Sequence, residues 1–113
     1  LPNAENKLEA NYSGKNPIYL DAELTAFLAA NNVKHLLLDL PSVDREEDGG
    51  ALAAHKAFWQ YPENTRTDAT ITELIYVPNA VADGLYLLNL QIASFESDAS
   101  PSKPVLYNLL PNN

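Results

Sequence analysis

Glu73 is the residue whose neighbours in the sequence point most directly to chemistry. It lies in the run from Thr70 to Val77, which reads as a β-strand. Alternate side chains of a strand share one face, so Glu73 falls beside Ile71 and Ile75 on an apolar face. A carboxylate buried there needs a cation, a metal or strong hydrogen-bond donors. The pattern is equally compatible with a face that is exposed to solvent.

His55 is the second candidate, because a neutral imidazole is a good ligand for zinc and related metals. It falls in a predicted helix among apolar residues such as Leu52 and Phe58, so we expect a partly buried ring. The alternative is a core histidine that makes a single hydrogen bond. A catalytic zinc site usually has three protein ligands, so His55 and Glu73 together would still need another.

Further acidic residues lie near position 40 and shortly after it. Asp39 ends an apolar run, and residues at the ends of strands often line sites in α/β folds. A carboxylate that anchors a loop by accepting backbone hydrogen bonds is the alternative for Asp39. The acidic run over residues 44–48 lacks the ligand spacing of a calcium-binding loop, so we expect a solvated loop that leads into a helix.

The elements that must position these residues follow from the apolar pattern. Residues 1–20 are polar and are expected to form a loop, and Asp21 is a suitable N-cap for the first helix. The pattern favours an α/β (α+β) fold in which strands over residues 35–40, 70–77 and 85–92 share one sheet, the first of them buried on both faces. The helices are predicted over residues 21–31 and 50–60, and a last strand over residues 104–109.

Composition restricts the partners. Fifteen acidic and seven basic residues among 113 give a formal net charge of −8, which disfavours nucleic acid and anionic membranes as partners. The absence of Cys excludes disulfides and thiolate metal sites. No apolar run is long enough to span a membrane, and we expect a cytoplasmic protein. The chain contains no Met and begins Leu1-Pro2-Asn3, so we expect it to be a piece of a longer protein.

Three segments, taken together and in order, resemble the C-terminal half of the metal-dependent cyclase family, which includes bacterial kynurenine formamidases and isatin hydrolases. The first segment is Asp39-Leu40-Pro41-Ser42-Val43-Asp44, with its PSVD motif. The others are Ala53-Ala54-His55-Lys56 and Ile71-Thr72-Glu73-Leu74, and residues 94–105 also look like the closing loop of the family. The resemblance covers most of residues 11–109.

The resemblance implies a swivelling β/β/α domain, of which residues 1–113 would be the C-terminal part. It implies a divalent metal, zinc or manganese, and hydrolysis of a small amide or cyclic amide such as N-formylkynurenine, with metal-activated water attacking the carbonyl. By position, His55 matches the family's metal-site histidine and Glu73 matches its metal-binding glutamate. Both are therefore implied as metal ligands and catalytic residues, and the substrate-binding residues stay unidentified.

Two departures from the family pattern shape the remaining expectations. The family motif H-x-G-T-H-x-D, which supplies the other ligands, does not occur in the chain, and residues 60–69 lengthen the interval between His55 and Glu73. We therefore expect the partners to be the amide substrate and either a missing N-terminal half or a second copy of the chain. We expect the chain alone to be inactive and able to lack the metal, because the strongest ligands are missing. The alternative function is a non-catalytic binding or partner module derived from the same fold.

Overall fold

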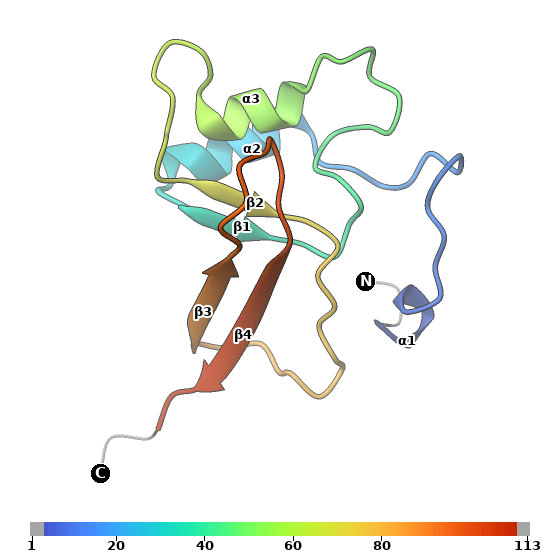
Figure 1. The fold of residues 1–113 in the computed structure, drawn as a ribbon, viewed down its shortest axis with the longest axis vertical. Coiled ribbons are helices and arrows are strands. Elements are labelled where there is room, and N and C mark those ends of the chain that lie inside the picture. The colour runs from blue at the N-terminus through green and yellow to red at the C-terminus, as the bar shows by residue number, and fades with distance from the viewer. Residues whose placement is uncertain (1–3, 111–113) are drawn as a thin grey trace. The chain divides into compact units, whose positions relative to one another are not determined.

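The computed structural model describes residues 4–110, so the expectation drawn from Leu1-Pro2-Asn3 lies outside the described residues. The fold is a small mixed α/β arrangement with two compact units, one extending to Pro78 and the other beginning at Asn79 (Figure 1). The elements, in chain order, are α1 (Ala4–Lys7), α2 (Ala22–Ala30), β1 (His35–Leu37), α3 (Ala53–Trp59), β2 (Thr70–Thr72), β3 (Tyr86–Ile92) and β4 (Ser102–Asn108).

The first unit is built around a parallel pair of strands connected through a helix. β1 pairs with β2, with Leu36 opposite Ile71, and α3 lies in the connection between them. Helices α2 and α3 pack against each other and lie on the same side of this sheet (Figure 1). The core joins Ala29 of α2, Phe58 of α3 and Ala69 before β2, with Leu36 and Ile71 packed against it.

Helix α2 confirms the prediction made from its sequence to within one residue at each end. Its N-cap is Asp21, whose Oδ1 accepts a hydrogen bond from the Glu23 N–H at 2.7 Å. This contact satisfies one of the backbone donors that the first turn of a helix leaves without a partner. At the other end the Asn31 side chain donates to the Phe27 carbonyl, and Asn32 takes a left-handed conformation.

Helix α3 is shorter than the predicted span of residues 50–60 at its N-terminus. Gly49, Gly50 and Leu52 all have positive φ, and this left-handed backbone cannot belong to a right-handed helix. The first helical residue is therefore Ala53, and Gln60, with φ of 53°, ends the helix. The side chain of Leu52, at the N-cap position, makes no capping hydrogen bond.

Both strands of the first unit are shorter than predicted. β2 ends at Thr72 because Leu74 takes a left-handed conformation, with φ of 54°. The two segments are still joined by backbone hydrogen bonds beyond the regular ladder, since the Leu74 N–H donates to the Leu40 carbonyl and the Ile75 N–H to the Leu38 carbonyl. The expectation that residues 35–40 are buried on both faces is wrong, because His35 is exposed and the remainder are half-buried.

The second unit contains an antiparallel hairpin of β3 and β4, with Leu88 opposite Leu106. These strands lie close to the predicted ranges of residues 85–92 and 104–109, but the prediction of one shared sheet is wrong, since the described strands form two separate pairs. Pairing across the short connection of residues 93–101 closes a small loop and therefore costs little chain entropy. The specific domain type of the cyclase family remains a prediction.

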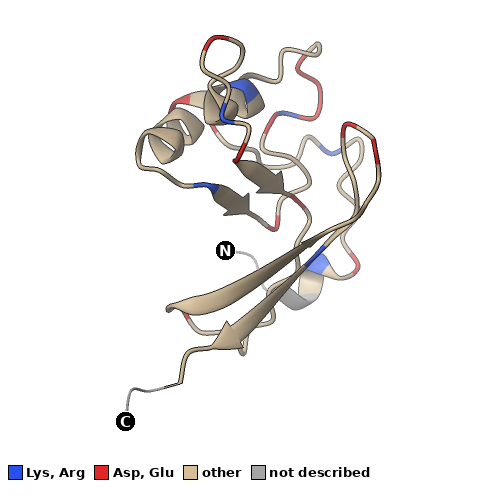
Figure 2. Cartoon of the chain, turned by 60° about the vertical axis from the view of Figure 1, so that its left-hand side comes forward, with Lys and Arg blue, Asp and Glu red and all other residues tan. Residues whose placement is uncertain are grey.

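Charge is distributed unevenly over these elements. None of the four strands contains an acidic residue, and most acidic positions lie in loops (Figure 2). Within β3 and β4, Lys103 is the only charged residue. Among residues 4–110, no helix is long and apolar enough to cross a membrane.

Candidate functional site

The structure brings the two predicted site residues together. Nε2 of His55 lies 3.5 Å from Oε1 of Glu73, although the residues are far apart in the sequence. The side chain of His55 is 18% exposed and that of Glu73 is 29% exposed, so both are shielded yet reachable from solvent. Their assignment as metal ligands stays a prediction.

Glu73 reaches this position because it follows β2 instead of lying within it. Its Oε1 accepts a hydrogen bond from the Val43 N–H at 2.8 Å, which joins the end of β2 to the loop after β1. Val43 is fully buried, so the donor has no competing water. The alternation used to place Glu73 on an apolar face does not extend past Leu74, because the left-handed backbone there interrupts it.

Asp44 contacts His55 and forms a cluster with His55 and Glu73. It is 7% exposed, and its Oδ2 lies 2.6 Å from Nδ1 of His55. The same carboxylate accepts the Ala54 N–H on Oδ1 at 2.7 Å and the His55 N–H on Oδ2 at 3.2 Å. Asp44 therefore caps α3 from ten positions away, and its negative charge suits the N-terminal end of a helix.

Sequence reasoning missed the role of Asp44, which it treated as part of a solvated acidic loop. That interpretation is wrong for Asp44, because the residue is buried against α3. No local signal in the sequence pointed to it, because the position of Leu52 as an N-cap without a capping side chain is visible only in the structure. A helix without a local cap indicates that a more distant carboxylate could satisfy its first turn.

Asp48 shows what the rest of the acidic loop does. Its carboxylate accepts the Gly50 N–H on Oδ1 and the Leu52 N–H on Oδ2, both at 2.7 Å. The hydrogen bond from Leu52, followed by that from Gly50, lowers the pKa of Asp48 below its ordinary value, because both stabilise the ionised form. Asp48 thus holds the strained turn ahead of α3.

Asp39 was considered as a site residue at the end of a strand, but its partner in the structure is a lysine. Its carboxylate forms an ion pair with the ammonium group of Lys7, in α1. The Lys7 side chain is 11% exposed, so the pair is shielded from water and attaches α1 to the end of β1. This contact supports an anchoring role for Asp39. The expected anchor was a set of backbone hydrogen bonds, whereas the structure shows an ion pair with a lysine side chain.

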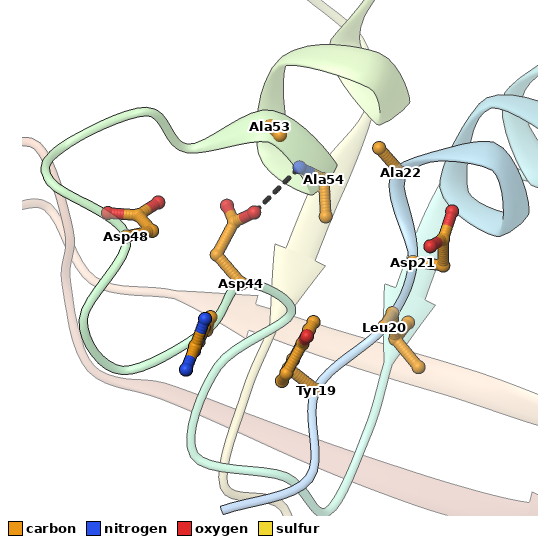
Figure 3. Close-up of a pocket in the computed structure, with 9 residues that line it drawn as sticks. Tyr19, Leu20, Asp21, Ala22, Asp44, Asp48, Ala53 and Ala54 are labelled. Atoms are coloured by element: carbon orange, nitrogen blue, oxygen red, sulfur yellow. Dashed lines mark hydrogen bonds between the residues drawn. The ribbon is translucent and has the colours of Figure 1, made fainter. Parts of the chain in front are cut away.

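A pocket of about 220 Å³ lies between the segment that enters α2, the acidic loop and the start of α3 (Figure 3). Tyr19, Leu20 and Ala53 contribute to its lining, as do Asp44 and Asp48. Neither His55 nor Glu73 is among the lining residues, so the pocket is distinct from the place where these side chains meet. Asp44 is shared by both, since it lines the pocket and also contacts His55.

The side chains in this cluster supply fewer metal ligands than a complete metal centre needs. Within residues 4–110 no group of three or more His, Cys, Asp or Glu side chains is placed to hold one ion. Asp44 occupies the opposite ring nitrogen of His55, which leaves His55 and Glu73 as a pair of candidate ligands. No protein-family model, no curated protein and no solved structure matches the chain.

Proposed function

We propose that the chain contributes part of the active site of a metal-dependent hydrolase, arylformamidase-like, that cleaves a small amide or cyclic amide. His55 and Glu73 would hold the metal, zinc or manganese. The observation that carries this proposal is the 3.5 Å separation of Nε2 and Oε1. Two atoms that each bind one tetrahedral zinc ion at about 2.1 Å lie roughly 3.4 Å apart, so the spacing fits a shared ion.

The chemistry of the two atoms supports a cation between them. A carboxylate oxygen carries negative charge, and a ring nitrogen without a proton presents a lone pair, so the two atoms together suit a divalent cation. The Val43 N–H holds Oε1 in place, so the carboxylate does not depend on the metal for its orientation. A bound divalent metal would supply a Lewis acid that polarises a carbonyl and acidifies water.

The remaining donors must come from elsewhere, because a catalytic zinc site usually takes three protein ligands and keeps one position open. We propose that a segment with the motif H-x-G-T-H-x-D supplies them from outside residues 1–113, since the motif does not occur within these residues. In that assembly His55 and Glu73 would be two of the residues that hold the ion, and the amide substrate would bind beside them.

A non-catalytic binding or partner module is the second candidate. The hairpin of β3 and β4 favours it, because Leu87, Leu106 and Tyr107 leave 44–61% of their surface exposed. Two-stranded hairpins are marginal on their own, and such apolar surface is typical of a contact with another protein segment. In this reading the cluster at His55 is an inherited structural feature without a metal.

Metal titration of a protein that contains His55 and Glu73 together with the H-x-G-T-H-x-D segment tests the first proposal. We expect Zn²⁺ or Mn²⁺ to bind in a calorimeter, and His55→Ala or Glu73→Gln to weaken binding at least ~10-fold, since losing a ligand costs more than losing its outer partner. His35→Ala is the matched control, because His35 is exposed and contacts Thr70 instead. Equal loss in His35→Ala, or no binding by the unaltered protein with that segment present, would contradict the proposal.

Activity needs the remaining donors as well. The assay is hydrolysis of N-formylkynurenine by a protein that contains His55 and Glu73 together with the H-x-G-T-H-x-D segment. Loss of turnover in Glu73→Gln with unchanged thermal stability supports the hydrolase. Metal binding without turnover of any small amide favours the binding module.

A further inference from the structure

We propose that Asp44 is a positioning residue, which keeps the proton of the His55 ring on Nδ1 and leaves Nε2 as a bare acceptor facing Glu73. The consequence for metal binding rests on the function proposed above. The tautomer itself follows from the geometry of Asp44 and His55, so the two ideas can fail separately.

The contact between Asp44 and the ring determines where the proton lies. An ionised carboxylate can only accept hydrogen bonds, so the 2.6 Å approach of Oδ2 to Nδ1 requires a proton on Nδ1. Asp44 is 7% exposed, and therefore little water can compete for this contact. In a neutral imidazole, a proton on Nδ1 leaves Nε2 with a free lone pair.

The carboxylate of Asp44 is itself held in one orientation. Both of its oxygens accept backbone N–H groups from the first turn of α3, Oδ1 from Ala54 and Oδ2 from His55. The Asp44 N–H in turn donates to the Ser42 hydroxyl at 3.1 Å. The carboxylate is therefore held to the same helix that carries the His55 ring.

The ring of His55 also lies near an aromatic ring of its own helix. The ring of Trp59, one helical turn later, lies 5.3 Å from it between centroids and is tilted by 45°. Nε2 lies 3.5 Å from Oε1 of Glu73. Metal-ligating histidines commonly donate their other ring N–H to a carboxylate, which sets the tautomer and raises the basicity of the ligand. The chain reproduces that outer contact with Asp44, which indicates a divalent cation as the group recognised at Nε2.

Asp44→Asn is the informative substitution. The asparagine oxygen can still accept the Ala54 N–H, so much of the helix cap is retained. Its amide group can donate to Nδ1, which favours the tautomer with the proton on Nε2 and occupies the metal-binding lone pair. Asp48→Asn is the matched control, because Asp48 also accepts two backbone N–H groups in this loop and is not seen to contact His55.

The tautomer can be read without any metal. Long-range ¹H–¹⁵N spectra of the imidazoles at pH about 8, where an ordinary imidazole is neutral, distinguish protonated from bare nitrogens. We expect His55 to be protonated on Nδ1 in the unaltered chain and in Asp48→Asn, and on Nε2 in Asp44→Asn. His35 serves as the internal reference in every spectrum. A proton on Nε2 in the unaltered chain, or no change in Asp44→Asn, overturns the assignment.

Titration with Zn²⁺ alone then tests the consequence. Asp44→Asn should weaken binding about 10–100-fold, whereas Asp48→Asn should bind as the unaltered chain does. Equal affinity in Asp44→Asn and the unaltered chain overturns the positioning role. If the unaltered protein binds no Zn²⁺ even with the H-x-G-T-H-x-D segment present, the proposed function fails, while the spectra still decide whether Asp44 sets the tautomer.

Discussion

Replacing Arg66 with Met should destabilise the first unit markedly, because Arg66 joins three parts of it. Its guanidinium donates to the Phe58 carbonyl at 2.9 Å and to the Val33 carbonyl at 2.7 Å. It also lies 5.0 Å from the centre of the Phe58 ring. The Phe58 carbonyl belongs to the last turn of α3, where carbonyls lack partners within the helix. Arg66 therefore ties the end of α3 to the segment that enters β1.

The magnitude follows from these contacts. A hydrogen bond to a charged group contributes about 1.5–3 kcal/mol. Arg66 is half-buried, so water can partly replace it, and we take about 2–3 kcal/mol for the two bonds together. With a urea dependence of about 1 kcal/mol per molar for a unit of this size, the midpoint should fall by roughly 2 M.

The single tryptophan provides the assay. Trp59 donates its indole N–H to the Ala69 carbonyl at 3.0 Å, so its fluorescence reports on the same region. Arg66→Lys should give an intermediate midpoint, because one ammonium cannot reproduce the two-pronged contact. Arg45→Met is the control, since Arg45 is exposed and should change stability by less than ~0.5 kcal/mol. A midpoint for Arg66→Met within about 0.5 M of the unaltered chain would refute the reasoning.

Three further outcomes are expected. Phe58→Ala should lower the free energy of unfolding by about 3–5 kcal/mol, because the ring is fully buried; urea unfolding that gives less than ~1 kcal/mol would contradict the core assignment. The pKa of Asp48 is lower in the folded state than in the unfolded chain, so its carboxylate stabilises the fold above the pKa of the unfolded chain. This stabilisation is lost as the pH falls through the pKa of the folded state. Melting temperatures recorded down to pH about 3 should therefore fall less steeply in Asp48→Asn, and parallel curves would argue against this. The chain should also associate through apolar surface such as Leu87 and Tyr107, as measured by light scattering after size exclusion; a monomer with cooperative unfolding would favour a self-sufficient module.

Local patterns in the sequence determined several elements of this protein. Asp21 followed by apolar residues at helical spacing placed α2, because a cap and a periodic face act within a few residues. The hairpin strands β3 and β4 were predicted with small boundary errors for the same reason. His55 and Glu73 were also identified as candidates, since a histidine on an apolar helix and a carboxylate among apolar strand residues are visible without a structure.

Tertiary structure alone decided how these pieces meet. The partner of each strand depends on chain entropy and packing over the whole unit, so one predicted sheet became two pairs. The end of β2 depends on the left-handed backbone at Leu74, for which the residue type gives no warning. The contacts of Asp44 with α3 and of Glu73 with the Val43 N–H span 10 and 30 positions, and no local pattern encodes a contact at that distance. Residue type thus indicated which groups could do chemistry, while long-range packing decided which atoms face one another.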